Sequence, residues 1–578
     1  MDPSFDPRPP TLTPNKTAVP STMDVALPGY PGVRGVSMYR TRFSHAGSRA
    51  RLQFMACSFY CRVFVDGKEV GDHRAGGYVP WWLDLPVAPE GHAQELFVLA
   101  DNRFNSTTAP MHTGGDFWHY GGLMRSVLLH TLPSAGQAWV WRAYVLPRAG
   151  PDLGVVNLNV TLTDPQFTGS LVLALDFDGS GVRMLQEVAA SNGHIFMAGV
   201  WIPNPRVWSL EDPQLHTVAV TIGKATVVER FGLRHWSTDA ASSRVALNGK
   251  VVKLHGWNHH TQWPDTGASP TAQQMDSDLR LLREAGANYV RGAHYPQDQR
   301  WLDRLDELGM AMWEETLGPS TTVENLQDWD FFMKHQLQQL DEVLDASLNH
   351  PSIMTWGWFN EGPSDNKLSC PAYAACANLA RARDPTRFLT WASNKELRDQ
   401  CLEHATLISF NNYPAWYGHR YNWSMPAAHW NGAANEVRRL YPGKPFVISE
   451  TGAGGVWEWS HNSTAAVWTT KYQTKVIARD VDVALGNDNI SGITLWHFFD
   501  FKIDDAATAE CGPCKYLKDV EPPTCAYVNV SCHRPGGLNH KGVVDFWRRK
   551  KEAYGVVAAK YNASRGTSAQ EASTLLVV

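Results

Sequence analysis

Two glutamates each stand at the end of a short apolar run that contains aromatic residues. Glu361 closes the run Thr355-Trp-Gly-Trp-Phe-Asn-Glu361, and Glu450 closes the run Lys444-Pro-Phe-Val-Ile-Ser-Glu450. Since a glycine follows within two residues of each, both patterns predict a carboxylate at the C-terminal tip of a buried strand. Two carboxyl groups that face each other can cleave a glycosidic bond, because one protonates the leaving oxygen while the other attacks the sugar or directs water.

The chain around these glutamates repeats an apolar strand, a polar loop and a helix, which is the pattern of a (β/α)8 barrel. The strands are expected at residues 251–255, 287–291, 310–313, 353–358, 388–391, 407–410, 446–449 and 493–498. Helices are expected between them, for example at residues 275–285 and 331–346. Glu361 then follows the fourth strand and Glu450 the seventh, at the end of the barrel where the active sites of such folds lie.

A chain of 578 residues is too long for one barrel, so further domains are expected before it. Residues 36–132 alternate apolar and polar positions, and Asp66-Gly67 marks a hairpin turn, which predicts a β-sandwich. Residues 137–237 alternate in the same way over the length of an immunoglobulin-like sandwich. The expected division is a disordered tail at 1–30, sandwiches at 31–135 and 136–238, the barrel at 239–563 and a second tail at 564–578.

Charge and hydropathy exclude some classes of partner. The formal net charge is −5, the sequence pI is about 6.5 and no long basic run occurs, so neither nucleic acid nor a membrane surface is an expected partner. No apolar stretch has the length of a transmembrane helix. Most of the 24 tryptophans are expected in the core, but such rings also stack on sugar faces, which favours a carbohydrate partner.

Eight Asn-X-Ser/Thr sequons favour a secretory route, with a secreted or a lysosomal or vacuolar destination. They begin at Asn15, Asn105, Asn159, Asn422, Asn462, Asn489, Asn529 and Asn562. The first residues lack the basic and apolar parts of a signal peptide, which is then expected to have been trimmed or to be missing from the sequence. Four of the nine cysteines, Cys511, Cys514, Cys525 and Cys532, cluster after the eighth strand, where disulfides are favoured over a zinc site. The odd total leaves at least one thiol free or paired with another chain.

Several motifs resemble those of glycoside hydrolase family 2, which holds β-galactosidases, β-glucuronidases and β-mannosidases. They are Asp116-Phe-Trp-His-Tyr-Gly-Gly-Leu-Met-Arg125, Asn248-Gly-Lys250, Leu254-His-Gly-Trp-Asn-His-His260, Asn288-Tyr-Val-Arg-Gly-Ala-His294-Tyr-Pro296, Trp313-Glu-Glu315 and Asn360-Glu361. The resemblance spans about residues 36–561. It implies a jelly-roll-like sugar-binding sandwich, an immunoglobulin-like sandwich and a catalytic TIM barrel, in that order. It also implies homo-oligomers, since family members often assemble through the sandwiches, although the sequence does not set the oligomeric state.

By this resemblance Glu361 is the general acid/base and Glu450 is the nucleophile of a retaining β-glycosidase. Glu450 must be ionised and Glu361 must hold a proton, so their environments should push their pKa values apart. Asn360 is expected to hydrogen-bond the sugar 2-hydroxyl. The resemblance also implies that Tyr413 bonds Glu450, that His294 and Trp496 line the sugar site, and that Asp116 reaches in from the first sandwich.

The expected substrate is a β-D-glucuronide, because two loops resemble those of the short β-glucuronidases. They are Asn411-Asn-Tyr413-Pro-Ala-Trp-Tyr417 and Arg534-Pro-Gly-Gly-Leu-Asn539-His-Lys541-Gly542. Lys541, Asn539 and Arg534 would donate charge-assisted hydrogen bonds to the C6 carboxylate of a uronic acid. Family members that act on neutral galactosides also carry Asn-X-Lys-Gly here, so a β-galactosidase or a β-galacturonidase stays open.

The sequence departs from the glucuronidase pattern at Thr451, at the extra residue Leu538 and in the cysteine-rich insertion at 511–532. These differences bear on the substrate and not on the reaction. The sequence does not identify the leaving group either, because long barrel loops form the outer part of the site.

Two other classes of protein make different predictions. A non-catalytic carbohydrate-binding protein would be expected to lose one of the two glutamates or Asn360, and all three are present. A metal-dependent barrel hydrolase predicts His-X-His after the first strand, which His255-Gly-Trp257 does not supply. The adjacent His259 and His260 lack the i, i+4 spacing of a helical metal site and are expected to shape the pocket floor or a loop. No metal and no cofactor is therefore expected.

Overall fold

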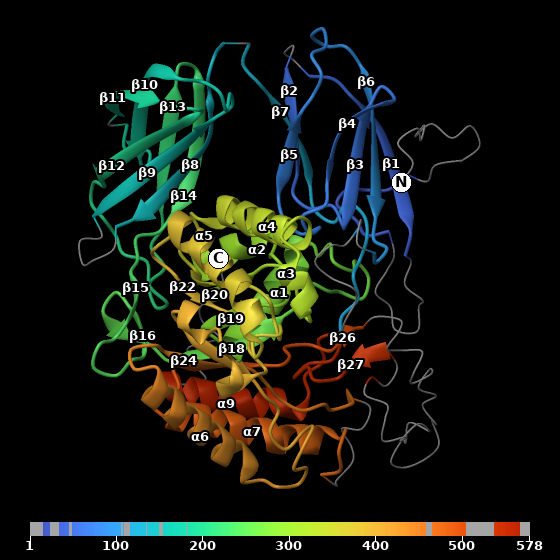
Figure 1. The fold of residues 1–578 in the computed structure, drawn as a ribbon, viewed down its shortest axis with the longest axis vertical. Helices are drawn as coiled ribbons and strands as arrows, with labels where there is room; N and C mark the ends of the chain where they lie inside the picture. The colour runs from blue at the N-terminus through green and yellow to red at the C-terminus, as the bar shows by residue number, and fades with distance from the viewer. Residues whose placement is uncertain are drawn as a thin grey trace.

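The computed structural model describes residues 16–23, 34–45, 49–105, 108, 116–134, 136–148, 154–181, 183–457, 465–503, 534 and 537–566. Figure 1 shows two β-sandwiches side by side at one end of the molecule and a barrel of strands and helices beneath them. This arrangement confirms the predicted fold class of two sandwiches followed by a (β/α)8 barrel.

The first sandwich consists of short strands with apolar inward side chains. One sheet has the order β1 (Val36–Phe43), β6 (Gln94–Asp101), β3 (Tyr60–Val65) and β4 (Lys68–His73). The other has the order β5 (Trp81–Asp84), β2 (Ala50–Phe54) and β7 (Val127–Thr131). Asp66 and Gly67 have φ values of 50° and 81°, so the predicted hairpin between β3 and β4 has the tight turn that suits twisted strands.

The second sandwich follows the alternation seen in the sequence. One sheet has the order β11 (Arg183–Ala190), β10 (Gly169–Phe177), β13 (His216–Ile222) and β14 (Ala225–Phe231). The other has the order β12 (His194–Trp201), β9 (Val155–Leu162) and β8 (Val140–Pro147). In β9 every second side chain, from Val156 to Leu162, is buried. A small sheet then leads into the barrel, with β15 (Trp236–Thr238), β16 (Val245–Leu247) and β17 (Lys250–Val251).

The barrel is an eight-stranded parallel sheet with the order β22-β21-β20-β19-β18-β25-β24-β23. Its strands are β18 (Leu254–His259), β19 (Tyr289–Gly292), β20 (Ala311–Glu315), β21 (Ile353–Gly357), β22 (Phe388–Thr390), β23 (Ile408–Asn411), β24 (Phe446–Thr451) and β25 (Gly492–Leu495). A parallel bridge between Ser393 and Phe410 joins the two outer strands of this order. All eight predicted strands are present, but the first was placed too early, because residues 250–251 pair with β16 in the small sheet.

Helices cover the outside of the barrel. They are α1 (Ala272–Glu284), α2 (Gln299–Leu308), α3 (Val323–Gln327), α4 (Phe332–Ser347), α5 (Cys370–Arg383), α6 (Met425–Leu440), α7 (Thr470–Gly486) and α9 (Glu552–Arg565). Short 3-10 turns lie at Lys367–Ser369, Glu396–Arg398 and Leu402–His404, and β26 (Phe501–Lys502) pairs with β27 (Leu538–Asn539). The first helix begins after Thr271, which forms a capping box with Gln274.

The first sandwich packs against the mouth of the barrel. Tyr78 stacks on Tyr295 with ring centres 4.1 Å apart. The buried Arg125 donates to the Tyr78 carbonyl at 2.5 Å and to the Pro296 carbonyl at 2.7 Å. Because these contacts join the sandwich to the loop after β19, they hold the segment that carries Asp116 over the C-terminal ends of the barrel strands.

The structure describes two disulfides, Cys57–Cys61 and Cys370–Cys401, and a buried free thiol at Cys376. The four clustered cysteines, the tail residues 1–15 and 567–578 and the sequons at Asn15, Asn462 and Asn529 lie outside the described residues. Of the helices that the structure describes, none combines the length and the apolar character needed to cross a membrane.

Candidate active site

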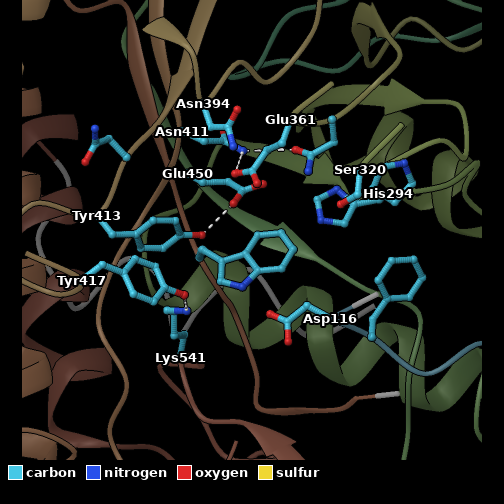
Figure 2. Close-up of a pocket in the computed structure, with 15 residues that line it drawn as sticks. Asp116, His294, Ser320, Glu361, Asn394, Asn411, Tyr413, Tyr417, Glu450 and Lys541 are labelled. Carbon is cyan, nitrogen blue, oxygen red and sulfur yellow. Dashed lines mark hydrogen bonds between the residues drawn. The ribbon is translucent and has the colours of Figure 1, made fainter. Parts of the chain in front are cut away.

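A cavity of about 360 Å³ lies at the C-terminal ends of the barrel strands, against the first sandwich (Figure 2). Its lining residues are Asp116, Phe117, His294, Pro319, Ser320, Asn360, Glu361, Asn394, Asn411, Asn412, Tyr413, Tyr417, Glu450, Trp496 and Lys541. This set contains every site residue expected from the sequence except Arg534 and Asn539. Asp116, from the first sandwich, and Lys541, near the end of the barrel region, therefore share one pocket.

Glu450 is held at both carboxylate oxygens. Its Oε1 accepts a hydrogen bond from Arg291 Nη1 at 2.8 Å, and its Oε2 accepts one from the Tyr413 hydroxyl at 2.6 Å. Burial, and then the charge of Glu450, raise the pKa of Tyr413 well above its ordinary value, so the phenol remains a donor. Two donors thus orient the carboxylate at the end of the seventh strand.

The donor Arg291 ends the second strand and has no exposed surface. Its guanidinium donates to both oxygens of Glu315, at 3.1 and 2.9 Å, and to Asn258 Oδ1 at 2.9 Å. Burial by itself lowers the pKa of Arg291, but the charges of Glu315 and Glu450 outweigh it and raise that pKa above the ordinary value. A permanent cation therefore lies beneath the pocket.

Glu361 has a different environment. Its backbone is left-handed, with φ 56°, and its N–H donates to the Ala392 carbonyl at 2.8 Å. Its Oε1 accepts from Asn411 Nδ2 at 3.0 Å. Burial, and then the negative charge of Glu450, raise the pKa of Glu361, and the hydrogen bond from Asn411 only partly offsets them. Glu361 consequently keeps its proton to a higher pH than an ordinary glutamate.

The amides beside the two glutamates have fixed orientations. Asn360 Oδ1 accepts from Arg291 Nη2 at 2.9 Å and from Asn411 Nδ2 at 3.1 Å. Asn411 Oδ1 in turn accepts from Ser449 Oγ at 2.7 Å. Because the oxygen of Asn360 is occupied, its Nδ2 is the group that can donate into the pocket, for example to a sugar hydroxyl.

A stacked pair, His294 and Trp496, lines another part of the cavity. Their ring centres are 4.9 Å apart and their planes differ by 17°. His294 Nδ1 lies 3.1 Å from Glu315 Oε1, within hydrogen-bond distance, so the carboxylate orients this ring. Burial raises the pKa of Glu315, but Arg291 and His294 outweigh it and lower that pKa below its ordinary value.

Lys541 is a buried cation at the opposite wall from Glu361 (Figure 2). Its Nζ donates to the Tyr417 hydroxyl at 2.6 Å and lies within 5 Å of the ring centres of Tyr413 and Tyr417, at 4.9 and 4.7 Å. In the described part of the chain, no carboxylate lies within ion-pair distance of this ammonium. A buried charge without an opposite charge is costly, so a ligand carboxylate would stabilise Lys541.

Arg534 and Asn539 have a different partner from the one expected. Asp116 Oδ1 accepts from Arg534 Nε at 2.5 Å, and Oδ2 accepts from Arg534 Nη2 and from Asn539 Nδ2, the latter at 2.8 Å. Burial lowers the pKa of Arg534, but the charge of Asp116 outweighs it and raises that pKa above the ordinary value. Neither Arg534 nor Asn539 lines the cavity, so of the three expected carboxylate donors only Lys541 lies in the cavity wall.

The two adjacent histidines lie outside the cavity lining. His260 packs behind it, with its ring centre 5.4 Å from that of Trp496, and His259 Nε2 lies 3.1 Å from Asp278 Oδ2. They support the pocket from behind and do not form its floor.

One group of possible metal ligands occurs among the residues that the structure describes. It consists of Asp303, Asp306 and His350, and none of the three lines the cavity. Arg230 Nη2 lies 2.6 Å from Asp303 and 3.9 Å from Asp306. Because Arg230 already pairs with these acids, the group is explained as an ion-pair cluster between α2 and the second sandwich.

Arg291, Glu315 and Asn411 were not predicted as site residues from the sequence. The signal was available, because Arg291 and Glu315 stand at the ends of the second and third strands, as Glu361 and Glu450 do at the ends of theirs. A charged residue at that end of a barrel strand is therefore a candidate site residue. Asn394, Asn412 and Ser320 lie on loops and carried no such signal.

The sequence of this chain is similar to those of known glycosidases. Residues 240–527 match the family described as glycosyl hydrolases family 2, TIM barrel domain. A β-glucuronidase of Bacteroides fragilis is 28% identical over 566 residues, which cover 92% of this chain and 75% of that protein. A human β-glucuronidase is 24% identical, with 83% and 78% covered. A β-galactosidase of Thermoanaerobacter pseudethanolicus is 26% identical, with 65% and 51% covered.

Solved structures of a β-galacturonidase and of a β-glucuronidase are also similar to this chain. A family 2 β-galacturonidase from Eisenbergiella tayi, bound to galacturonate, has a TM-score of 0.83 and 26% identity, and the match covers 96% of this chain and 95% of that one. A β-glucuronidase from Ruminococcus gnavus, in complex with D-glucuronic acid, has a TM-score of 0.77 and 21% identity, with 95% and 92% covered. The second likeness shows the shared fold.

The raised pKa of Glu361 predicts that Glu361→Gln stabilises the protein near neutral pH. Between the ordinary value of 4.5 and the higher value in the folded state, the unfolded chain has lost this proton while the folded chain keeps it, so the contribution of Glu361 to stability falls as pH rises. We expect the thermal midpoint of the variant to exceed that of the wild type at about pH 7.5 and the difference to vanish below about pH 4.

The exposed Glu90 offers a matched control, since Glu90→Gln should leave the difference near zero at both pH values. Calorimetry or intrinsic fluorescence can follow the midpoints. A Glu361→Gln variant that is less stable than the wild type at neutral pH would contradict this account of its environment.

Proposed function

The chain belongs to glycosyl hydrolase family 2, and from this premise we propose that it is a retaining exo-β-glycosidase that removes terminal β-D-glucuronic acid residues. The chain is an O-glycosyl hydrolase with a carbohydrate substrate. The observation that carries the proposed reaction is the pair of facing carboxyl groups, one held by two donors and the other with a raised pKa. Such a division of roles suits double displacement.

In the first step Glu450 attacks the anomeric carbon, and Glu361 gives its proton to the leaving oxygen. Arg291 and Tyr413 fix the direction of Glu450 Oε1 and Oε2 before the substrate binds, so little reorganisation is needed during attack. A covalent glycosyl-enzyme forms with inverted configuration, and the aglycone leaves with the proton of Glu361.

In the second step Glu361, now ionised, takes a proton from water, and the resulting hydroxide displaces Glu450 from the sugar. Loss of the negative charge of Glu450 in the covalent intermediate removes one of the causes that raise the pKa of Glu361, and this favours the change from acid to base. Two inversions give retention. Asn360 Nδ2 supplies a donor for a sugar hydroxyl next to the reacting carbon.

Lys541 supports a uronic acid as the glycone. Its ammonium is buried beside Tyr417 in the pocket wall, and the nearby acid Asp116 already binds Arg534. A C6 carboxylate would supply the missing negative charge, whereas a neutral hydroxymethyl group would not. Arg534 would then act indirectly, by holding Asp116 at the wall where the sugar hydroxyls lie.

A second candidate is a β-galacturonidase. The likeness to the Eisenbergiella tayi structure, whose ligand is galacturonate, favours it over a neutral β-galactosidase, since the same carboxylate would meet Lys541. Glucuronate and galacturonate differ only in the orientation of the 4-hydroxyl, so the two candidates share the entire argument from Lys541.

The proposed roles predict different losses for the two glutamates. Glu450→Gln should abolish turnover, because no covalent intermediate can form. Glu361→Gln should lower kcat/KM by about 10²- to 10⁴-fold on alkyl glycosides and by much less on p-nitrophenyl glycosides, whose leaving groups need little protonation. Its kcat should fall on both kinds of substrate, because the second step loses its base. Glu436→Gln on α6, where the side chain is half-buried at the surface, serves as the control. NMR of the first product formed should show the β-anomer, and an α-anomer or near-wild-type rates in either variant would contradict the mechanism.

The role of Lys541 predicts a selective loss on uronides. We expect Lys541→Met to lower kcat/KM for p-nitrophenyl β-D-glucuronide or β-D-galacturonide by about 30- to 150-fold, equivalent to about 2–3 kcal/mol for a charged hydrogen bond. Turnover of p-nitrophenyl β-D-galactoside should change little, and the remote Lys560→Met should affect none of them. Equal losses on all three substrates, or a wild-type preference for the galactoside, would contradict the uronide assignment.

We also propose that the chain follows a secretory route. Two disulfides support this, since such bonds persist in oxidising compartments. Among the described sequons, the side chains at Asn105 and Asn422 are exposed, whereas those at Asn159, Asn489 and Asn562 are partly buried.

Secretion from a eukaryotic host is therefore expected to add glycans at Asn105 and Asn422, while Asn159, within β9, stays unmodified. Mass spectrometry of peptides before and after enzymatic glycan removal measures this. Protein that reaches the medium with both exposed asparagines unmodified would argue against the proposal.

A further inference from the structure

The wall of the cavity beside Glu361 carries polar side chains that the proposed chemistry at the glycone does not use. Asn394, Asn412 and Ser320 all line the cavity. Figure 2 shows Asn394 next to Glu361 and Asn411, across the cavity from Asp116 and Lys541. Since Glu361 protonates the leaving oxygen in the proposed mechanism, this wall faces the leaving group.

The backbone fixes Asn394 relative to Glu361. The Glu361 N–H donates to the carbonyl of Ala392, two residues before Asn394, at 2.8 Å. The next residue, Ser393, donates from its hydroxyl to Asp399 at 2.7 Å, and Asp399 also accepts from the Ser364 hydroxyl at 2.6 Å. One carboxylate thus ties the loop of Asn394 to the loop of Glu361.

A covalent bond joins the same two loops. The Cys370–Cys401 disulfide connects the start of α5, just after the Glu361 loop, with the turn that follows Asp399. Trp391 Nε1 adds a hydrogen bond to Asp399 at 2.8 Å. Asn394 therefore stands on a braced loop, and its position relative to the acid is built into the fold.

The amide of Asn394 has an unused acceptor. Its Oδ1 is shielded from solvent, and no group in the described part of the chain donates to it. A buried acceptor without a donor is uncommon in folded proteins, because leaving it unpaired is unfavourable. Rotation of this amide about its Cβ–Cγ bond would exchange Oδ1 and Nδ2 and turn the oxygen to the cavity that Asn394 lines, where a ligand hydroxyl can donate to it.

Asn412 is oriented by a second carboxylate. Its Nδ2 donates to Glu396 Oε1, and His429 Nε2 lies 3.0 Å from the same oxygen. Burial raises the pKa of Glu396, but His429 and the hydrogen bond from Asn412 outweigh it and lower that pKa. No described residue donates to Asn412 Oδ1, so this oxygen and the second N–H of Nδ2 are the groups that Asn412 can offer to a ligand.

We propose that Asn394 and Asn412 form a leaving-group subsite that accepts hydrogen bonds from hydroxyl groups. Its ligand is a sugar, so the natural substrate is an oligosaccharide or polysaccharide end and not an aryl or alkyl glucuronide. Two amide oxygens at one wall match the donors of a hexose, whereas a planar aryl group offers them none. This inference rests on the proposed function, because it uses Glu361 as the acid beside the leaving oxygen.

The test compares two leaving groups on the same glycone. Its substrates are p-nitrophenyl β-D-glucuronide and the fastest cleaved of the β-1,3-, β-1,4- and β-1,6-linked disaccharides of glucuronic acid and glucose. The corresponding galactose compounds replace them if the wild type prefers that glycone. We expect Asn394→Ala to lower kcat/KM for the disaccharide by about tenfold, as for one lost hydrogen bond that is poorly replaced, and for the aryl substrate by less than about twofold.

Lys395→Ala is the matched control, since Lys395 is the next residue on the same loop and does not line the cavity. This control should leave the ratio of the two kcat/KM values unchanged. In every variant, retained turnover of the aryl substrate shows that the fold and the two glutamates are intact. Equal losses on both substrates, no loss on the disaccharide, or a wild type that cleaves only the aryl substrate would overturn the subsite. A wild type that cleaves neither uronide nor galactoside would instead overturn the proposed function.

Discussion

The geometry of the site depends on one buried cation, the guanidinium of Arg291. It lies without exposed surface under the pocket and bonds Glu450, Glu315 and Asn360 from three of its nitrogens. A buried charge is tolerated only with opposite charges and a full set of acceptors. Arg291 therefore needs these neighbours, and they in turn need its positive charge. The planar fork of arginine then sets the directions in which the carboxylates point.

This constraint explains why two glutamates of the same pocket differ. Glu450 and Glu315 both bind Arg291, whereas the direct partner of Glu361 is the amide of Asn411. The negative charge of Glu450, after burial, raises the pKa of Glu361. The same network fixes the amides, because Asn360 and Asn411 have their oxygens occupied by donors. The different environments of the two glutamates and the orientation of both amides thus follow from how one charge is satisfied in a low-dielectric interior.

Much of this was predictable from the chain, because the relevant signals are local. Apolar runs that stop at Glu361 and Glu450 identified both glutamates, and the alternating elements identified the barrel around them. The start of the first strand was misplaced because Lys250 and Val251 look like the apolar entry to a strand but pair with β16. Local pattern does not reveal which neighbour a strand residue takes.

Contacts between distant segments were harder to predict. Arg534 was expected to bind a ligand carboxylate, yet it pairs with Asp116, which lies 418 residues earlier in the chain. Both residues have the charge for either role, and only the packing of the sandwich on the barrel decides between them. The same holds for Asn394, whose position depends on a disulfide and on Asp399, not on the type of its neighbours.

The Asp116 contact also bears on how such a protein can change over evolution. One wall of the pocket belongs to a sandwich and the reacting glutamates belong to the barrel, so an exchange of sandwiches between relatives would keep the chemistry and alter the fit of the sugar. The two domains that build the cavity are joined by contacts of Tyr78, Arg125 and Asp116. A substitution at the Asp116–Arg534 contact can therefore reshape one wall of the cavity without touching either glutamate.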